Sequence, residues 1–144
     1  MEDMKTNIQL VDNYIKEYDL KLKKRILENT KIKLGISIIF GIVNIKEEDN
    51  KKIAQVNMEY NLDLIENEKE NVGKIHLIMQ ALFVAEKTVS NKEIEEELKY
   101  KGAPLLSQII ASYIMNNTAL SEIQTIKLPL IDFNEFFKNA KKEK

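Results

Sequence analysis

The single histidine, His76, is the residue in this sequence best suited to acid–base chemistry near neutral pH. It lies in an apolar stretch, between Ile75 and Leu77. A histidine that acts as a general base needs a carboxylate or a nucleophile within hydrogen-bond reach, and the neighbouring sequence indicates none. The favoured interpretation is therefore a structural or interfacial role, and catalysis is the alternative.

Acidic side chains are concentrated in two segments, residues 66–70 and the cluster formed by Glu93, Glu95, Glu96 and Glu97. A run of this kind is most often the solvated face of a helix or turn, and a docking site for a basic partner is the sharper alternative. The chain has no cysteine, which excludes disulfides, thiolate zinc sites and cysteine nucleophiles. No phosphate-binding glycine loop, Ser/His/Asp set or metal-ligand spacing is present. We therefore expect no enzymatic activity, no bound metal and no cofactor.

Composition places the chain among soluble globular proteins. Its 144 residues, 44% apolar and 31% charged, are enough for one domain with one core, spanning residues 1–144. Lys and Arg number 22 and Asp and Glu 23, a formal charge of -1, which argues against a nucleic-acid partner. No apolar run approaches the ~20 residues of a membrane span, and the first residues do not resemble a signal peptide. These features predict a cytoplasmic protein without membrane insertion.

Residues 33–86 are predicted to form three long antiparallel strands, joined by polar turns at 47–50 and 66–73. The middle strand, 53–65, alternates with a period of two, which is typical of a sheet with one buried face. Gly73 is expected to adopt a backbone angle that other residues resist. Residues 8–22 are predicted to form a further strand, bent or in two pieces, although a spacing of four between Leu10, Tyr14 and Tyr18 also suits a helix.

After residue 86 the pattern changes to helices. Ser90 and Glu93 form a capping box that begins a short helix, and Gly102 is expected to end it. Pro104 suits the first turn of a second, longer helix with a broad apolar stripe. Pro129 keeps residues 126–133 extended, and a last short helix is expected from Asn134 to about residue 140. The predicted fold is thus α+β: a four-stranded antiparallel sheet followed by a long helix and short flanking helices packed on one face.

Two of the three long strands carry apolar side chains on both faces, so the second face must be covered by something else. We interpret this second face as an oligomer interface in which two sheets stack. A groove for apolar segments of other chains is a compatible reading. The face is marked by Ile39, Val43, Ile45, Ile78, Leu82 and Val84.

The chain resembles the SecB family of protein-export chaperones in two respects. One is the order of elements: a short N-terminal strand region, three long strands, a long helix, an extended stretch and a short final helix. The other is a local run that follows the Pro104 helix, because the family typically has Leu-Pro-Pro-hydrophobic-Asn-Phe there. The matching positions are Leu128, Pro129, Ile131 and Phe133, whereas Leu130 and Asp132 replace the second proline and the asparagine.

This resemblance implies a homotetramer, arranged as a dimer of dimers, that holds unfolded polypeptides or preproteins along apolar grooves without ATP. It also implies a translocation ATPase as a partner, which docks partly through acidic residues on the sheet; none of those positions is carried over to this chain. The C-terminal residues Lys141, Lys142 and Lys144 make the tail basic, where the export chaperones have an acidic one. Relatives outside general export include chaperones dedicated to antitoxins.

The sequence therefore leaves three candidate functions. The first is an ATP-independent holdase in protein export, and the second is a specific interaction module with the same fold, such as an antitoxin-dedicated chaperone or a structural oligomer. The third is a small-ligand-binding domain, which would need an enclosed pocket with convergent polar groups. Only His76, Gln80 and Tyr60 offer such groups, so this reading ranks last.

Overall fold

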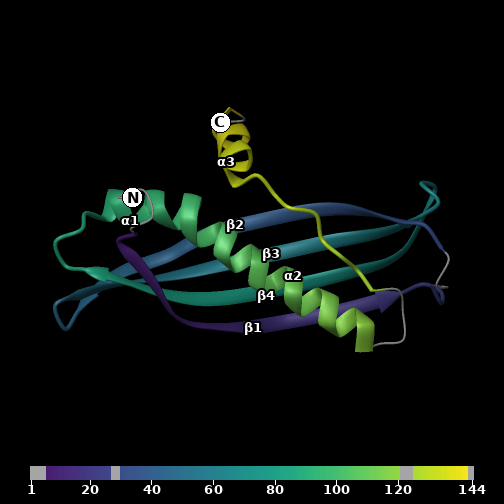
Figure 1. Cartoon of the computed structure of the whole chain (residues 1–144), viewed down its shortest axis with the longest axis horizontal. Helices are drawn as coiled ribbons and strands as arrows, with labels where there is room; N and C mark the ends of the chain where they lie inside the picture. Colours follow the sequence, from purple (N-terminus) through teal and green to yellow (C-terminus); the bar gives the residue numbers. More distant parts are fainter. Residues whose placement is uncertain (1–5, 27–29, 121–124, 143–144) are drawn as a thin grey trace.

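The computed structural model is one antiparallel sheet crossed on one face by a long helix (Figure 1). It describes residues 6–26, 30–120 and 125–142, with side chains as far as residue 118 in the second range and 138 in the third. The sheet order is β1-β4-β3-β2, so β1 and β2 are the edge strands. The strands are β1 (Ile8–Leu22), β2 (Ile32–Glu48), β3 (Lys51–Glu66) and β4 (Glu70–Glu86). This arrangement confirms the predicted α+β class.

Tight turns connect β2 to β3 and β3 to β4. Asp49 and Asn50 have φ of 50° and 64°, which is the backbone of a two-residue hairpin that matches the right-handed twist of the strands. Asn67 and Glu68 also have positive φ, and the Lys69 N–H donates to the Glu66 carbonyl across 3.0 Å. The second turn is thus shorter than the predicted connection at 66–73.

Gly73 lies inside β4 and does not have a positive φ, so the predicted reason for this glycine is wrong. Its role is close packing between strands. A Cβ at this position would lie 2.9 Å from the Lys21 carbonyl oxygen and 2.8 Å from Cδ2 of Leu22. Because β1 approaches β4 so closely here, only glycine fits without a shift of the backbone.

β1 is one strand bent by two irregularities, which confirms the bent strand among the two predicted alternatives. Its pairing with β4 shifts between Leu10 and Asp12 and again between Ile15 and Glu17. Each shift inserts one unpaired residue, which increases the local bend and moves the following side chains to the other face. Leu10, Tyr14 and Tyr18 therefore do not share one face: Leu10 and Tyr18 pair with the buried Phe83 and Leu77, whereas Tyr14 pairs with Gln80 on the other face.

The helical part is a continuous run rather than two separate helices. α1 (Asn91–Glu97) begins at Ser90, whose Oγ accepts the Glu93 backbone N–H at 3.2 Å, as the capping box predicts. A π-helical turn, η2 (Leu98–Gly102), then leads into α2 (Ala103–Leu120). The prediction that Gly102 ends the first helix is therefore wrong.

Two local features explain the π turn. The Ala103 N–H donates to the Leu98 carbonyl, five residues back, and Pro104 has no N–H with which to continue the α-helical ladder. Gly102 is buried against β4. A Cβ there would lie 3.3 Å from Cζ of Phe83, so the glycine lets the helix approach the sheet closely.

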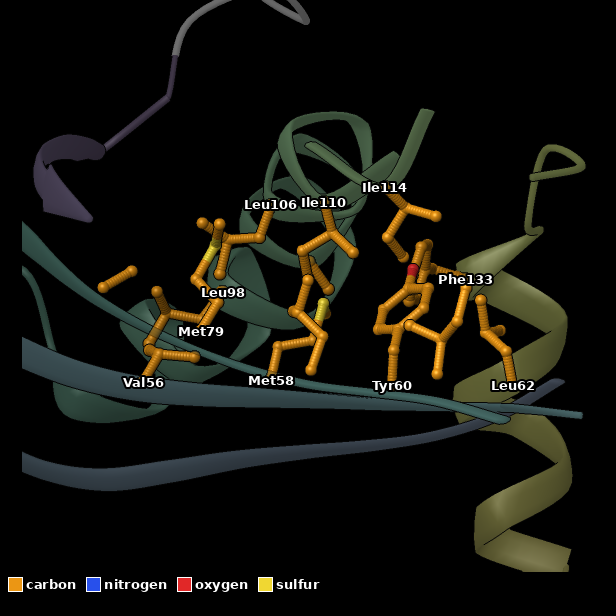
Figure 2. Close-up of a cluster of buried hydrophobic side chains, with 14 of the residues drawn as sticks. Val56, Met58, Tyr60, Leu62, Met79, Leu98, Leu106, Ile110, Ile114 and Phe133 are labelled. Carbon is orange, nitrogen blue, oxygen red and sulfur yellow. The ribbon is translucent and has the colours of Figure 1, made fainter. Parts of the chain in front are cut away.

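The core lies between the sheet and α2 (Figure 2). Alternate β3 residues point toward the helix and are fully buried, as the period of two predicts. The hydroxyls of Tyr60 and Ser107 share a hydrogen bond of 2.6 Å, which satisfies the tyrosine in this apolar layer. The buried side chains from the two layers include Val56, Met58, Tyr60, Leu62, Met79, Leu106, Ile110 and Ile114.

An extended segment, 125–132, connects α2 to α3 (Phe133–Lys142) and crosses the same face of the sheet as α2 (Figure 1). The Ile126 N–H donates to Oγ1 of Thr118 at 2.9 Å, which anchors the start of the segment. Oδ1 of Asp132 accepts the Asn134 and Glu135 N–H groups and caps α3.

Of the family-motif positions, Leu128 and Ile131 pack against the core and Phe133 is buried. Pro129 is exposed. The predicted extended stretch and final helix are confirmed.

Candidate functional site

The sheet face opposite α2, here called the open face, is the candidate interaction surface. It is formed by odd-numbered residues 55–63 of β3, even-numbered residues 74–84 of β4 and the residues that pair with them on β1 and β2. Ile39 and Val43 on β2 and Tyr14 on β1 are each exposed to about half, at 58%, 50% and 51%. These exposed apolar side chains are the feature that makes this face a candidate contact surface.

Five of the six predicted interface residues share this face. Ile39 and Val43 lie on the edge strand β2, and Ile78, Leu82 and Val84 are half-buried on β4. The two groups are not contiguous, because β3 lies between them with polar side chains. Those β3 residues are Gln55, Asn57, Glu59, Asn61 and Asp63. The open face is therefore two apolar strips separated by a polar one, rather than a single apolar groove.

The sixth residue, Ile45, lies on the other face and packs against the core, so its predicted placement is wrong. The pairing of β2 with β3 shifts between Ile42 and Asn44, which leaves Val43 as an extra residue. Beyond this bulge, Ile45 pairs with the buried Ala54. A strict alternation along β2 cannot reveal this, because one inserted residue exchanges the two faces.

His76 lies in the middle of the open face between two carboxylates. Its Nδ1 is 3.7 Å from Oε1 of Glu17 on β1, and its Nε2 is 3.4 Å from Oε1 of Glu59 on β3. Sequence reasoning missed both partners because they come from the two neighbouring strands. The three side chains are partly exposed and the carboxylates lie on opposite sides of the ring, so the arrangement is a weak polar link between strands that becomes ionic only when His76 carries a proton.

A shallow hollow of about 220 Å³ lies beside β1, lined by Asp12, Tyr14, Gln55, Gln80 and Leu82. The Tyr14 hydroxyl donates to Oε1 of Gln80 at its rim. The volume is below the ~300–1,000 Å³ typical of small-ligand pockets. Tyr60 does not contribute to it, because its hydroxyl is buried on the opposite face of the sheet. The three residues of the small-ligand hypothesis therefore do not share one face of the sheet, because Tyr60 lies opposite His76 and Gln80.

The acidic cluster at α1 has one member with a structural role. Glu97 accepts hydrogen bonds from the Asn7 backbone N–H at 3.0 Å and from the Thr6 hydroxyl at 3.2 Å, and Lys101 lies 3.1 Å away. Burial opposes ionisation of Glu97, but these three donors outweigh it and lower the pKa of the carboxyl. Glu93, Glu95 and Glu96 are exposed, as the solvated-face reading predicts.

The described ranges contain neither a metal site nor a membrane-spanning helix. Among residues 6–26, 30–120 and 125–142, no group of three His, Asp or Glu side chains is arranged to hold a metal ion. None of the helices described there combines the length and apolar character needed to cross a bilayer.

Comparisons with known proteins bear on the fold. No family model matches the sequence, and no curated protein matches it. Among solved structures, the chain is similar to a SecB-like chaperone of Mycobacterium tuberculosis, in complex with a ChAD peptide from the antitoxin HigA1. The TM-score is 0.62 at 12% identity, covering 88% of this chain and 91% of that one. A protein of unknown function from Streptococcus agalactiae has a TM-score of 0.49 at 15% identity, covering 85% of this chain and 96% of that one.

At this identity the first likeness concerns the fold. It confirms the SecB-like architecture expected from the element order and from the run between Leu128 and Phe133.

Proposed function

We propose that this chain is an ATP-independent holdase chaperone that binds unfolded or pre-translocation polypeptides on its open face. The observation that carries the proposal is the pair of exposed apolar side chains Ile39 and Val43, on a SecB-like sheet whose other face is already closed by α2. An unfolded client offers apolar segments, and covering apolar surface contributes ~25 cal/mol per Å².

The division of the open face suits extended clients. Apolar strips on β2 and β4 can take apolar side chains, and the polar strip between them presents the amides of Gln55 and Asn61. Amides both donate and accept, so they can pair with the unsatisfied backbone groups of an unfolded chain. Contacts of this kind depend little on the client's sequence, as a holdase requires.

A dedicated partner is the second candidate, and one observation favours it. The similar mycobacterial chaperone has a ChAD peptide of an antitoxin bound. A module of this kind would bind one partner tightly and protect few others. Its polar contacts, such as the acidic pair Glu17 and Glu59 around His76, would then select the partner.

The aggregation of a chemically denatured model protein, diluted into buffer without nucleotide, tests the proposal. A holdase suppresses light scattering at a few-fold molar excess of chain, and added ATP leaves the suppression unchanged. Absence of suppression at tenfold excess, combined with capture of one abundant partner in a pull-down, would favour the dedicated module. Capture of a translocation ATPase or of an antitoxin then distinguishes an export role from an antitoxin role.

A further inference from the structure

The shallow hollow beside β1 combines a carboxylate, an aromatic ring and an apolar wall. These are supplied by Asp12, Tyr14 and Leu82, and Gln55 and Gln80 add amide groups. Among the described residues that line the hollow there is no Lys or Arg. Its volume of about 220 Å³ is below that of typical metabolite pockets, but it can admit one side chain of a bound polypeptide.

A bulge in β1 brings the Asp12 carboxylate to this hollow. Leu10 and Asp12 are two residues apart, so they would share a face in a regular strand. Leu10 pairs with the buried Phe83, but the register shift that follows pairs Asp12 with Leu82 on the open face. Bulges often redirect a side chain toward a functional site. The irregularity of β1 thus places a charged group where strict alternation would have turned it toward the core.

Asp12 differs from the other two carboxylates of β1 in having no partner within the part of the chain that the structure describes. Oε1 of Glu17 lies 3.7 Å from Nδ1 of His76, and Oδ2 of Asp19 lies 3.5 Å from Nζ of Lys21. Asp12 is exposed and makes neither an ion pair nor a hydrogen bond with the described residues. Its charge is therefore available to a positively charged ligand.

The Tyr14 side chain is anchored at the rim of the hollow. Its hydroxyl donates to Oε1 of Gln80, which lies opposite it on β4, while 51% of the residue stays exposed. A guanidinium group is planar, so it can stack on an aromatic ring and donate to a carboxylate at the same time. An ammonium group is a compact point charge without a flat surface. Asp12 and Tyr14 together therefore favour arginine over lysine.

We infer that this hollow binds the guanidinium group of one arginine of a client polypeptide, with Asp12 as counter-ion and Tyr14 as stacking surface. The inference rests on the proposed function and names a chemical preference within it. Leu82 lines the hollow and also belongs to the apolar strip on β4, so the neighbours of the bound arginine lie on that strip. Client segments with an arginine next to apolar residues should bind best.

Peptide binding to the full chain tests the inference. The probe is a short fluorescent peptide of leucine, isoleucine and serine with one central arginine, compared with the same peptide carrying lysine or citrulline, the uncharged isostere of arginine. Wild type should bind the arginine peptide about threefold to tenfold more tightly than the citrulline peptide, as a partly exposed ion pair and one ring contact allow. Asp12→Asn should abolish this preference and leave the affinity for the citrulline peptide unchanged. Equal affinities in wild type, or a preference that survives Asp12→Asn, would overturn the inference.

Two further variants separate the hollow from the general charge of the open face. Asp19→Asn removes a carboxylate from the same strand and face but outside the hollow, and it should keep the preference for arginine over citrulline. Loss of the preference in this control would mean that overall charge, rather than the hollow, attracts the arginine. Tyr14→Leu should bind the arginine and lysine peptides equally, and a retained preference for arginine over lysine would exclude the stacking contact.

A probe that is not a client separates this inference from the proposed function. N-acetyl-arginine amide at millimolar concentration should shift the side-chain amide resonances of Gln55 and Gln80 in wild type but not in Asp12→Asn. N-acetyl-citrulline amide should shift them in neither. Shifts combined with no binding of any peptide would reject the holdase role and support the arginine site. Absence of shifts in wild type would overturn the site, even if unfolded clients bind elsewhere on the open face.

Discussion

Ile39 of β2 and Ile78 of β4 lie in one row of the open face, with Glu59 of β3 paired to both. Adjacent strands are ~4.8 Å apart, so the two isoleucines are separated by roughly 10 Å with a carboxylate between them. Oε1 of Glu59 also lies 3.4 Å from Nε2 of His76, which is two residues before Ile78 on β4 and on the same face. A client that engages both apolar strips therefore has to lie across a polar strip, and both strips should contribute to binding.

Substitution of Ile39 by aspartate should weaken client binding. Burial of an isoleucine contributes ~1.5–3 kcal/mol, so its loss should reduce client affinity about tenfold or more. Ser37→Asp is the control, because Ser37 is exposed on the same strand and face and has no apolar side chain to lose. Titration of a fluorescent unfolded client measures both. Equal affinity of Ile39→Asp and wild type would exclude the β2 strip from client binding.

Gly73→Ala should destabilise the fold. The added methyl group would lie 2.9 Å from the Lys21 carbonyl, which is backbone and cannot rotate away, so we expect a loss of about 1–3 kcal/mol. Gly41→Ala is the matched control, since no atom lies within 4 Å of a Cβ there, and it should leave stability unchanged or raise it by about 0.5–1 kcal/mol. Urea unfolding measures both variants. A loss in Gly41→Ala as large as in Gly73→Ala would contradict the close-packing explanation.

Acid should loosen the attachment of Thr6 and Asn7 to α1. The pKa of Glu97 is lowered in the folded state, so its contribution is present above the carboxyl's ordinary pKa and is lost as the pH falls through the lowered value. Hydrogen exchange of the Asn7 amide should therefore quicken on acidification relative to amides in the middle of β3. Glu97→Gln should remove this pH dependence, whereas Glu96→Gln, at an exposed position, should retain it.

Tyr60→Phe should cost about 0.5–1.5 kcal/mol, because it removes a hydrogen bond in the core and leaves the Ser107 hydroxyl without this partner. Burial is the main reason that the pKa of Tyr60 is raised, and the bond to Ser107 partly offsets it. The double variant Tyr60→Phe with Ser107→Ala should recover part of the loss. Thermal unfolding of the three variants measures the coupling, and additive effects would show that the two hydroxyls act independently.

Short-range sequence patterns were sufficient to predict a large part of this fold. The period of two in β3 correctly identified the buried residues from Ala54 to Leu64, since side chains of a regular strand alternate whatever its neighbours are. Ser90 marked the start of α1, and Pro129 kept its segment extended, because both effects act through the residue's own backbone. These signals are short-range, so they can be read without knowledge of the fold.

Only the tertiary structure decided which strands are neighbours and where their register slips. The bulge at Val43 moved Ile45 to the covered face, and strand order brought Glu17 and Glu59 to His76. Gly73 and Gly102 are required by another element that passes close by, rather than by their own backbone angles. Each of these depends on contacts between residues far apart in the sequence. The residue types limit which contacts each side chain can make, and the register of the sheet determines which side chains come into contact.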